Sequence, residues 1–325
     1  MTGLPEIIPV FRAVTVTTAL LLCFWELSVY LSYQGVTASG FFDDAYGWKD
    51  KSQYQRRPYM GKRSIFDKAG IESACEEFYS LYDVTKGRTL DMCRAKQEHI
   101  RQVAKNCYTI AEAEGLDEYD RDLSWVIGEL HDFARFGQVI STSSFFSEGF
   151  DHARLGARIL FTHGMVKDII LNFDDISDED KAVMEKAVYY HSAFELPQDL
   201  TDRECLFCEI IRQADRADIF RFDATNSCET VLGHTEEELL ASDISDSVLE
   251  CYQNHKMCDY SKNVTIADYY LSSNAICFGI TFPSAKKMVL DQGYLWKLVN
   301  VTFTDSETEK KYRRAKESVK EFFNV

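Results

Sequence analysis

The sequence predicts an all-α protein, a helical bundle with additional C-terminal helices and an irregular N-terminal extension. Three observations indicate this fold class. The 325 residues include 5 prolines and 16 glycines, which favours long helices over a β fold rich in turns. Hydrophobic residues make up 46% of the chain, enough for a substantial core. After about residue 66, apolar residues recur at steps of three and four, the period of one helix face.

The N-terminal extension covers residues 1–65, and the helical domain is expected to span 66–325. Residues 14–31 are close to the length of a membrane span but include the charged Glu26. A membrane contact through this segment and a soluble extension are both open alternatives. If the segment spans a membrane, the six lysines and arginines between 49 and 63 place the large domain in the cytoplasm. Residues 40–65 are interpreted as a linker or irregular loop, whose basic residues are expected to form a solvated surface, with a phosphate site as the alternative.

The composition narrows the classes of function. The formal net charge is −16, which argues against binding double-stranded nucleic acid, because that role requires a basic face. A small phosphorylated substrate remains compatible, since a local basic pocket is enough. The 10 cysteines are scattered, so we expect buried thiols in a reducing cytoplasm and no disulfide scaffold. Cys205 and Cys208 lie in a helical pattern without a second such pair, which favours core residues over a zinc site.

Two helical patterns lead to the first candidate ligand. The first runs over residues 67–80, and the second ends near Gly115, a natural helix stop. His99 lies beside the apolar stripe of the second helix. A lone histidine there is usually a core or boundary residue, so its interpretation depends on whether other candidate ligands occur later in the chain.

The strongest signal is the dipeptide His131-Asp132. We expect a third helix, capped by Asp120, whose apolar face ends at this pair, with Gly137 as a stop. Adjacent residues on a helix point about 100° apart, so the two side chains do not both face a core in the ordinary way. Both can reach one metal ion at the helix end, and a nitrogen with a carboxylate oxygen suits Zn, Mn or Fe. The alternative is a polar helix terminus.

Arg135 follows that pair by one turn. Its guanidinium can bind a phosphate group, because its N–H donors are spaced to form two parallel hydrogen bonds with phosphate oxygens. A salt bridge to Asp132 is the equal alternative. Residues 138–150 are rich in serine and are interpreted as a loop that could cover the site.

Two further helices bring more histidines. One begins at Asp151 or His152 and ends at Gly164. The next begins at Ser177, whose spacing from an acidic residue resembles a capping box, and ends at His191. His191 therefore occupies the same kind of position as the histidine of the dipeptide.

Thr201 and Glu204 form a clear capping box, and the helix after them carries Asp215 amid apolar residues. A buried carboxylate there needs a partner or a metal, because an unpaired charge in a core is costly. Amphipathic segments occur later at 248–252, 267–278, 288–299 and from 306 onward. We expect these to serve packing or oligomerisation.

The order of these residues resembles the HD-domain metal-dependent phosphohydrolase superfamily. A His on one helix, a His-Asp pair at the end of the next and an Asp on a much later helix is the ligand order of that family. Three segments are similar in sequence to uncharacterised bacterial members of the family: 131–138 (HDFARFGQ), 151–157 (DHARLGA) and 211–219 (IRQADRADI). Phe133 and Ala134 stand where many members carry a small aliphatic residue and Gly. The resemblance runs from about residue 90 to the C-terminus.

The resemblance implies a metal centre and an activity. The implied metal ligands are His99, His131, Asp132 and Asp215, holding a divalent Mn, Fe, Zn, Co or Ni ion. The implied reaction is hydrolysis of a nucleotide or another small phosphoester by a metal-activated water, as a phosphomonoesterase or phosphodiesterase. The implied catalytic residues are His152, His191 and Arg135.

His152 and His191 have two alternative roles. They act as bases or hydrogen-bond donors, or they bind a second metal with Asp132 bridging, as in the HD-GYP phosphodiesterases. The Gly-Tyr-Pro signature of that subgroup is absent, so its substrate is not assigned. Two other functions stay open. One is a di-iron oxygenase similar to myo-inositol oxygenase, and the other is a non-enzymatic metal-binding helical protein.

Overall fold

The structure is a computed structural model that describes residues 64–146 and 149–324. The apolar segment 14–31 and all six of the basic residues between 49 and 63 lie outside these ranges. Every regular element in the described ranges is a helix, which confirms the all-α prediction. Among these helices, none combines the length and the apolar character that crossing a membrane requires. The domain boundary at residue 66, the cytoplasmic location, the membrane contact and oligomerisation stay predictions.

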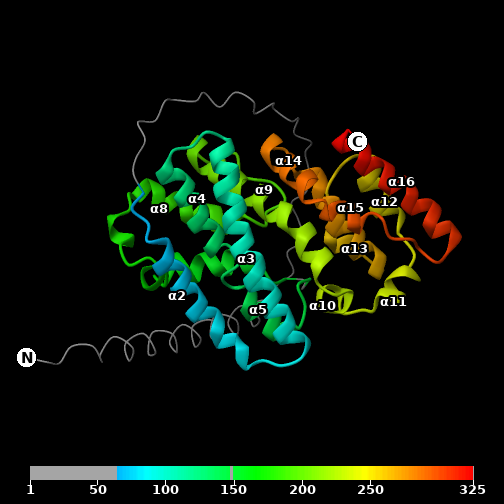
Figure 1. The fold of residues 1–325 in the computed structure, drawn as a ribbon, viewed down its shortest axis with the longest axis horizontal. Helices are drawn as coiled ribbons and strands as arrows, with labels where there is room; N and C mark the ends of the chain where they lie inside the picture. The colour runs from blue at the N-terminus through cyan, green and yellow to red at the C-terminus, as the bar shows by residue number, and fades with distance from the viewer. Residues whose placement is uncertain (1–63, 147–148, 325) are drawn as a thin grey trace, which may run out of the picture.

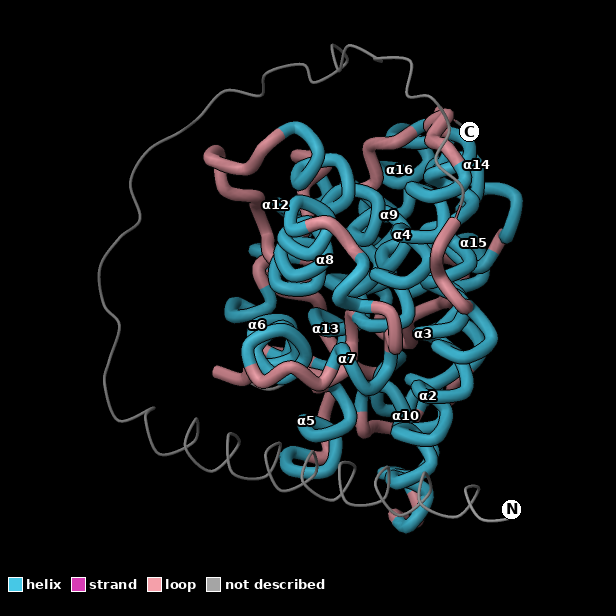
Figure 2. Tube along the Cα trace, turned by 90° about the vertical axis from the view of Figure 1, so that its left-hand side faces the viewer, coloured by secondary structure: helices cyan, strands magenta, loops and turns pink. Residues whose placement is uncertain are grey.

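The first half of the described chain forms a bundle around α3 (Figure 1). Its long helices are α2 (Lys68–Ser80), α3 (Arg88–Ala113), α4 (Glu118–Leu130), α8 (Asp178–Tyr190) and α9 (Asp202–Thr225). Its shorter elements are η1 (Leu81–Val84), α5 (Arg135–Thr142), α6 (His152–Ala157), the π-helical turn η2 (Arg158–Thr162), α7 (Val166–Ile169) and η3 (Phe173–Asp175). Helix α3 packs against α4 and α9, and α6 lies beside α8 (Figure 2).

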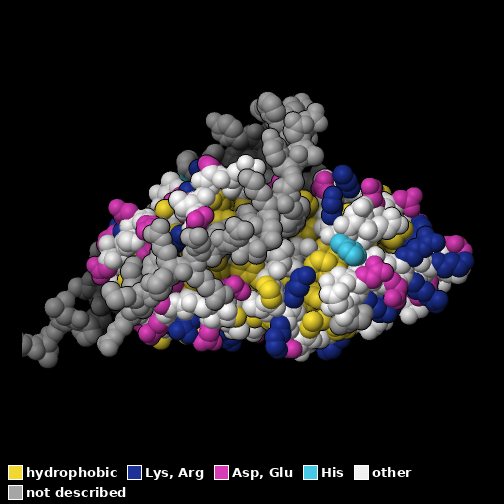
Figure 3. Space-filling model, turned by 90° about the horizontal axis from the view of Figure 1, so that it is seen from above, with side chains coloured by type: hydrophobic (Ala, Val, Ile, Leu, Met, Phe, Trp, Pro, Cys, Tyr) yellow, Lys and Arg dark blue, Asp and Glu magenta, His cyan; other side chains and the backbone are white. Residues whose placement is uncertain are grey.

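The second half adds a group of shorter helices at the end of α9 (Figure 1). They are α10 (Cys228–Leu232), α11 (Glu236–Leu240), α12 (Asp246–Gln253), η4 (Tyr260–Lys262), α13 (Ile266–Ala275), η5 (Ile276–Gly279), α14 (Pro283–Gln292), α15 (Tyr294–Leu298) and α16 (Ser306–Phe323). Helices α14 and α15 return to pack on α9. The far end of the molecule, at α16, carries interspersed acidic and basic side chains (Figure 3). Some pair along the helix, such as Lys310 with Glu307.

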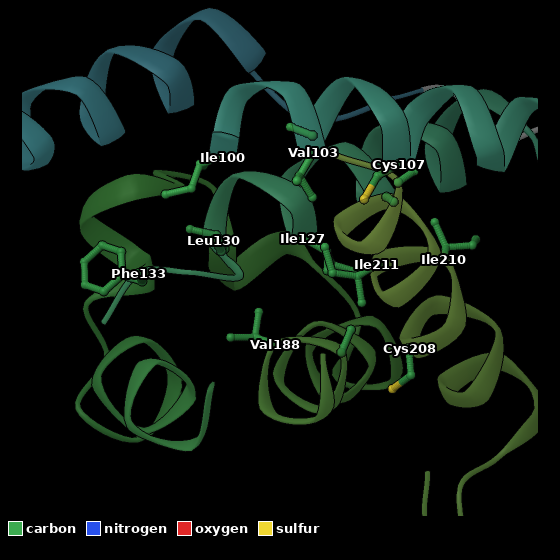
Figure 4. Close-up of a cluster of buried hydrophobic side chains, with 14 of the residues drawn as sticks. Ile100, Val103, Cys107, Ile127, Leu130, Phe133, Val188, Cys208, Ile210 and Ile211 are labelled. Carbon is green, nitrogen blue, oxygen red and sulfur yellow. The ribbon is translucent and has the colours of Figure 1, made fainter. Parts of the chain in front are cut away.

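The core of the bundle lies where α3, α4 and α9 meet (Figure 4). Ile100 and Val103 on α3 face Ile127 and Leu130 on α4, and Ile211 of α9 closes the cluster. All five side chains are buried, with at most 1% of their surface exposed. This apolar contact fixes the end of α4 and the middle of α3 relative to each other, which positions the side chains of the site at the end of α4.

Gly128 allows α3 and α4 to approach closely. A Cβ atom added there would lie 2.5 Å from the Cα and 2.9 Å from the N of Ala104. We therefore expect Gly128→Ala to cost about 1–3 kcal/mol of unfolding free energy, because backbone atoms must shift. Gly156→Ala is the control, since its nearest neighbour would be the N of Ala134 at 3.5 Å. Denaturant unfolding of both variants checks this, and equal stability of the two would contradict it.

Several helix boundaries were predicted correctly. Asp67 caps α2, Asp151 caps α6 and Ser177 caps α8, each by accepting a backbone hydrogen bond from the first turn. Thr201 and Glu204 form the expected capping box of α9. Gly115 lies just after the end of α3 with a φ of +78°. The nine described cysteines form no disulfide with one another, and Cys205 and Cys208 are buried as expected.

Two predicted boundaries around α4 and α5 are wrong. The cap of α4 is Asp117, which accepts a hydrogen bond from the N–H of Asp120, whereas Asp120 itself is buried in an ion pair. Gly137 lies inside α5 and does not stop a helix. The chain turns instead over residues 131–134, through hydrogen bonds between residues three apart. The predicted loop 138–150 is therefore helical up to Thr142.

One of the predicted C-terminal amphipathic segments consists of two helices, because Gly293 divides the segment 288–299 into α14 and α15. Gly293 has a φ of +69°, a left-handed conformation that glycine adopts without steric cost. The other three C-terminal segments are helical as predicted.

Candidate metal centre

Four histidines and two aspartates gather where α3, α4, α8 and α9 meet the beginning of α6. His99 comes from the middle of α3, and Asp215 from the middle of α9. His131 comes directly after the last residue of α4, and His191 directly after the last residue of α8. The structure thus brings together all the predicted site residues: His99, His131, Asp132, Arg135, His152, His191 and Asp215.

The two histidines at helix ends are held in one tautomer. Nδ1 of His131 lies 2.7 Å from the carbonyl oxygen of Gly128, and Nδ1 of His191 lies 2.7 Å from that of Val188. A carbonyl can only accept, so each Nδ1 carries the hydrogen and each Nε2 presents a lone pair. These carbonyls are free because the last turn of a helix leaves its acceptors without partners. A helix that ends at a histidine therefore orients the ring by itself.

His99 is oriented by a carboxylate. Its Nδ1 lies 2.8 Å from Oδ2 of Asp218, which two hydrogen bonds of 2.7 Å from Arg221 hold in place. Its Nε2 points to Oδ1 of Asp215 at 3.0 Å. Burial and Lys96 lower the pKa of His99, but the nearby carboxylates of Asp215 and Asp218 outweigh them and raise it. Asp218 thus positions the ring, and Asp215 lies on the side where a ligand would bind.

Asp132 lies between two groups of histidines. Its Oδ2 faces Nε2 of His131 at 3.6 Å and of His99 at 3.8 Å. Its Oδ1 faces Nε2 of His152 at 3.2 Å and of His191 at 3.6 Å. Burial alone would raise the pKa of Asp132, but the charges of Lys96 and Arg135 lower it well below its usual value. The ionised carboxylate therefore has one oxygen for each group.

Buried atoms without partners indicate that these residues fit a metal ion. Nε2 of His99 and of His131 are buried and have no aligned hydrogen bond. Burial lowers the pKa of His131 to about 4, so this lone pair is not protonated at neutral pH. Unpartnered buried polar atoms are rare because they cost free energy. Two sets of residues each offer potential ligand atoms that lie within 4.8 Å of one another inside the set. The first set is His99, His131 and Asp215, and the second is His131, Asp132 and His191.

The sequence of this region decides the family. Residues 97–218 match the family model of the HD domain. This part of the chain is an HD domain. The predicted resemblance to the metal-dependent phosphohydrolase superfamily is thereby confirmed. No curated protein matches the chain, and no solved structure does either.

The site contains one residue that the sequence interpretation missed, directly before the segment that matches the HD domain. Lys96 lies one turn before His99 on the buried face of α3, and its Nζ is 3.0 Å from Oδ2 of Asp132. It also lies 4.9 Å from the centre of the Phe222 ring. The sequence did contain a signal for Lys96, because it is a lysine on the apolar face of a helix beside a candidate ligand. Lysine is rarely buried without a charged partner, so this position predicts an acidic side chain nearby.

Arg135 in this HD domain is bound within the site. Its Nε is 3.3 Å from Oδ1 of Asp132, so the predicted salt bridge is present. Its Nη2 donates to Nε2 of His152 at 2.8 Å, and its Nη1 donates to Gln138 at 2.8 Å. A side chain held at three points presents its guanidinium in a fixed direction.

His152 opens α6 at the edge of a cavity. The cavity has a volume of about 320 Å³ and is lined by Gly149, Phe150, Asp151, His152 and Ser192. Nε2 of His152 lies 3.0 Å from Nε2 of His191. Burial and the Arg135 charge lower the pKa of His152 to about 3. The imidazole is therefore neutral at physiological pH, and its Nε2 lone pair accepts the hydrogen bond from Arg135.

Proposed function

We propose that the protein is a metal-dependent phosphohydrolase that cleaves a small phosphoester with an activated water molecule. The observation that carries the proposal is the Asp132 carboxylate, whose two oxygens face separate groups of histidines. Carboxylates that bridge two ions occur in hydrolytic sites with two metals. The HD domain supports the same reaction class, because its superfamily consists mostly of metal-dependent phosphohydrolases.

Six residues supply ligands in this proposal. The first ion would be held by His99, His131, Asp132 and Asp215, and the second by Asp132, His152 and His191. Mn, Fe, Zn, Co and Ni all accept imidazole and carboxylate ligands. When bound, such ions lower the pKa of a water molecule and offset the charge that develops on the phosphoryl oxygens.

The chain's own cations complete the site. Lys96 and Arg135 both contact Asp132, and their two positive charges exceed the single charge of that carboxylate. The guanidinium of Arg135 is already held in place, which favours two parallel hydrogen bonds from it to a phosphate group. His152 has a low pKa and is a poor proton donor at neutral pH. We therefore assign it to the second ion and not to proton transfer.

Metal analysis with a phosphate-release assay tests this proposal. Protein purified without air should contain about two ions per chain, and His152→Ala about one. His163→Ala is the control, because His163 is exposed after η2. We expect the control to keep both ions and the activity of the wild type on a panel of phosphoesters. Absence of metal from the wild type would contradict the proposal.

The same protein separates the alternatives. Consumption of oxygen by a protein with two irons, without phosphate release, would identify an oxygenase. Metal binding that stabilises the fold without either activity would identify a metal-binding helical protein. A hydrolase should release phosphate whether or not oxygen is present, because hydrolysis involves no electron transfer to oxygen.

A further inference from the structure

The turn that follows α8 carries His191 and is held in place through its backbone. The next three side chains anchor it little, since Ser192 is exposed, Ala193 offers only a methyl group and Phe194 is 57% exposed. The N–H of Ala193 donates to the carbonyl oxygen of Tyr190 at 3.1 Å. This bond joins the turn to α8 itself, so it does not fix the turn relative to any other helix.

Arg212 joins the same turn to α9. Its Nη2 donates to the carbonyl oxygen of Ala193 at 3.1 Å and to that of Phe194 at 2.9 Å. Its Nη1 donates to Oε1 of Glu209, one turn earlier on α9, at 2.8 Å. The Arg212 side chain is 5% exposed, so these bonds form away from bulk water. A guanidinium holds its donors in one rigid plane, and its bond to Glu209 therefore directs the other donors at the turn.

Helix α9 thereby connects the two groups of candidate ligands. Asp215 lies three residues after Arg212, and its Oδ1 faces Nε2 of His99 at 3.0 Å. The turn that Arg212 holds carries His191, whose Nε2 lies 3.6 Å from Oδ1 of Asp132. Residues three apart on a helix are neighbours on its surface. One helix thus supplies a ligand to the first group and holds the turn that supplies a ligand to the second.

We propose that Arg212 is a positioning residue for the second metal ion, because it holds the turn after α8 in the place where Nε2 of His191 faces the metal centre. The inference rests on the proposed function with its two ions. Val188 already sets the direction of the His191 ring, but a helix end frays, and His191 is the first residue beyond α8. Arg212 holds the segment that carries the ring. Loss of a group that orients a metal ligand typically weakens metal binding by about 10–100-fold.

Arg216 offers a matched comparison one turn later on α9. It is also buried, at 9% exposure, and its Nη1 donates to the carbonyl oxygen of Gly279 at 2.6 Å. That carbonyl also accepts a hydrogen bond from Gln213 at 3.2 Å, so it keeps a partner without Arg216. Gly279 ends η5 in the C-terminal helices. Arg212 and Arg216 thus make the same kind of bond, and only the bond of Arg212 reaches the turn of His191.

Retention of Mn²⁺ by the full chain tests this role. The protein is loaded with Mn²⁺ and dialysed against buffers of falling free Mn²⁺ concentration, and elemental analysis counts the ions kept per chain. The wild type should lose two ions in succession. Arg212→Met should hold one ion as the wild type does and the other about 10–100-fold more weakly. Arg212→Lys keeps the charge and part of the donors, so its loss should be smaller. Arg216→Met should match the wild type.

A double variant shows which ion is affected. His152→Ala lacks a ligand of the second ion and should keep one ion. Adding Arg212→Met to His152→Ala should leave the affinity for that remaining ion unchanged, because the site on which Arg212 acts is already lost. A residue that only stabilised the fold would weaken the remaining ion as well.

The fold is expected to tolerate Arg212→Met, since both carbonyl groups belong to a partly exposed turn where water can replace the lost donors. Helices α8 and α9 also pack against each other without Arg212. Denaturant unfolding of each variant checks this. If Arg212→Met does not fold, Arg212→Lys decides, and it should show the same selective loss of one ion at smaller size.

The outcomes separate this inference from the proposed function. Weakening of both ions alike, of neither, or to the same extent in Arg216→Met would overturn the positioning role. Phosphate release by a wild type that binds a single ion would leave a hydrolase and remove the role. Selective loss of one ion in Arg212→Met, in a protein that releases phosphate from no ester, would support the role and overturn the hydrolase.

Discussion

Asp132→Asn should lower phosphate release by about a thousandfold, because several kcal/mol of charge stabilisation by the metal would be lost. The amide keeps the shape of the carboxylate but has one oxygen instead of two. It cannot serve the His99 and His131 side and the His152 and His191 side together. We expect the metal content to fall with the activity, and elemental analysis of the purified variant measures this directly.

Asp122→Asn is the matched control for that variant. Asp122 is also a buried aspartate of the α4 region, and it also pairs with a lysine, Lys68. The same substitution there removes a charged partner from a lysine without touching the candidate metal centre. If Asp122→Asn lost as much metal and activity as Asp132→Asn, the loss would reflect folding, and the central role of Asp132 would be wrong.

The helices could be predicted because their signals are local. Thr201 and Glu204 act within one turn, and the apolar stripe of α3 results from spacing alone. The boundary at Asp120 failed because several acidic residues precede α4, and any of them could cap it. Asp117 is the cap since Asp120 is engaged by Arg203, 83 residues away. A contact so distant in sequence leaves no mark on local spacing.

The candidate site was predictable in part for the same reason. The order of His99, His131-Asp132 and Asp215 is visible in a single sequence because a family arrangement fixes it. Lys96 was missed because its role depends on one contact with Asp132, made between two helices. Asp223 on α9 and Ser273 on α13 form a hydrogen bond although 50 residues separate them in the sequence. The candidate metal ligands follow a family pattern, whereas contacts of this kind depend on tertiary structure.

The pairing of Arg203 with two aspartates predicts the largest effect on stability. Arg203 lies 2.6 Å from Asp120 and 2.7 Å from Asp180, which joins the beginnings of α4, α8 and α9. Both carboxylates are buried, at 4% and 2% exposure. Arg203→Met should cost about 3–5 kcal/mol of unfolding free energy, because two buried charges lose their cation. Arg121→Met, whose partner Glu112 is exposed, should cost less than about 1 kcal/mol.

The pH dependence of that loss identifies its cause. Burial acts to raise the pKa of Asp180, but hydrogen bonds from Arg203 and Ser177 outweigh it and lower the pKa. A lowered folded-state pKa stabilises the protein above the ordinary aspartate pKa of about 4, and this contribution disappears as the pH falls through the folded value. Without Arg203 the pKa of Asp180 should rise, and protonation would relieve the buried charge. Denaturant unfolding of metal-free protein should therefore show a smaller difference between wild type and Arg203→Met at about pH 4.5 than at about pH 7. A difference that is the same at both pH values would mean that lost packing, and not charge, destabilises the variant.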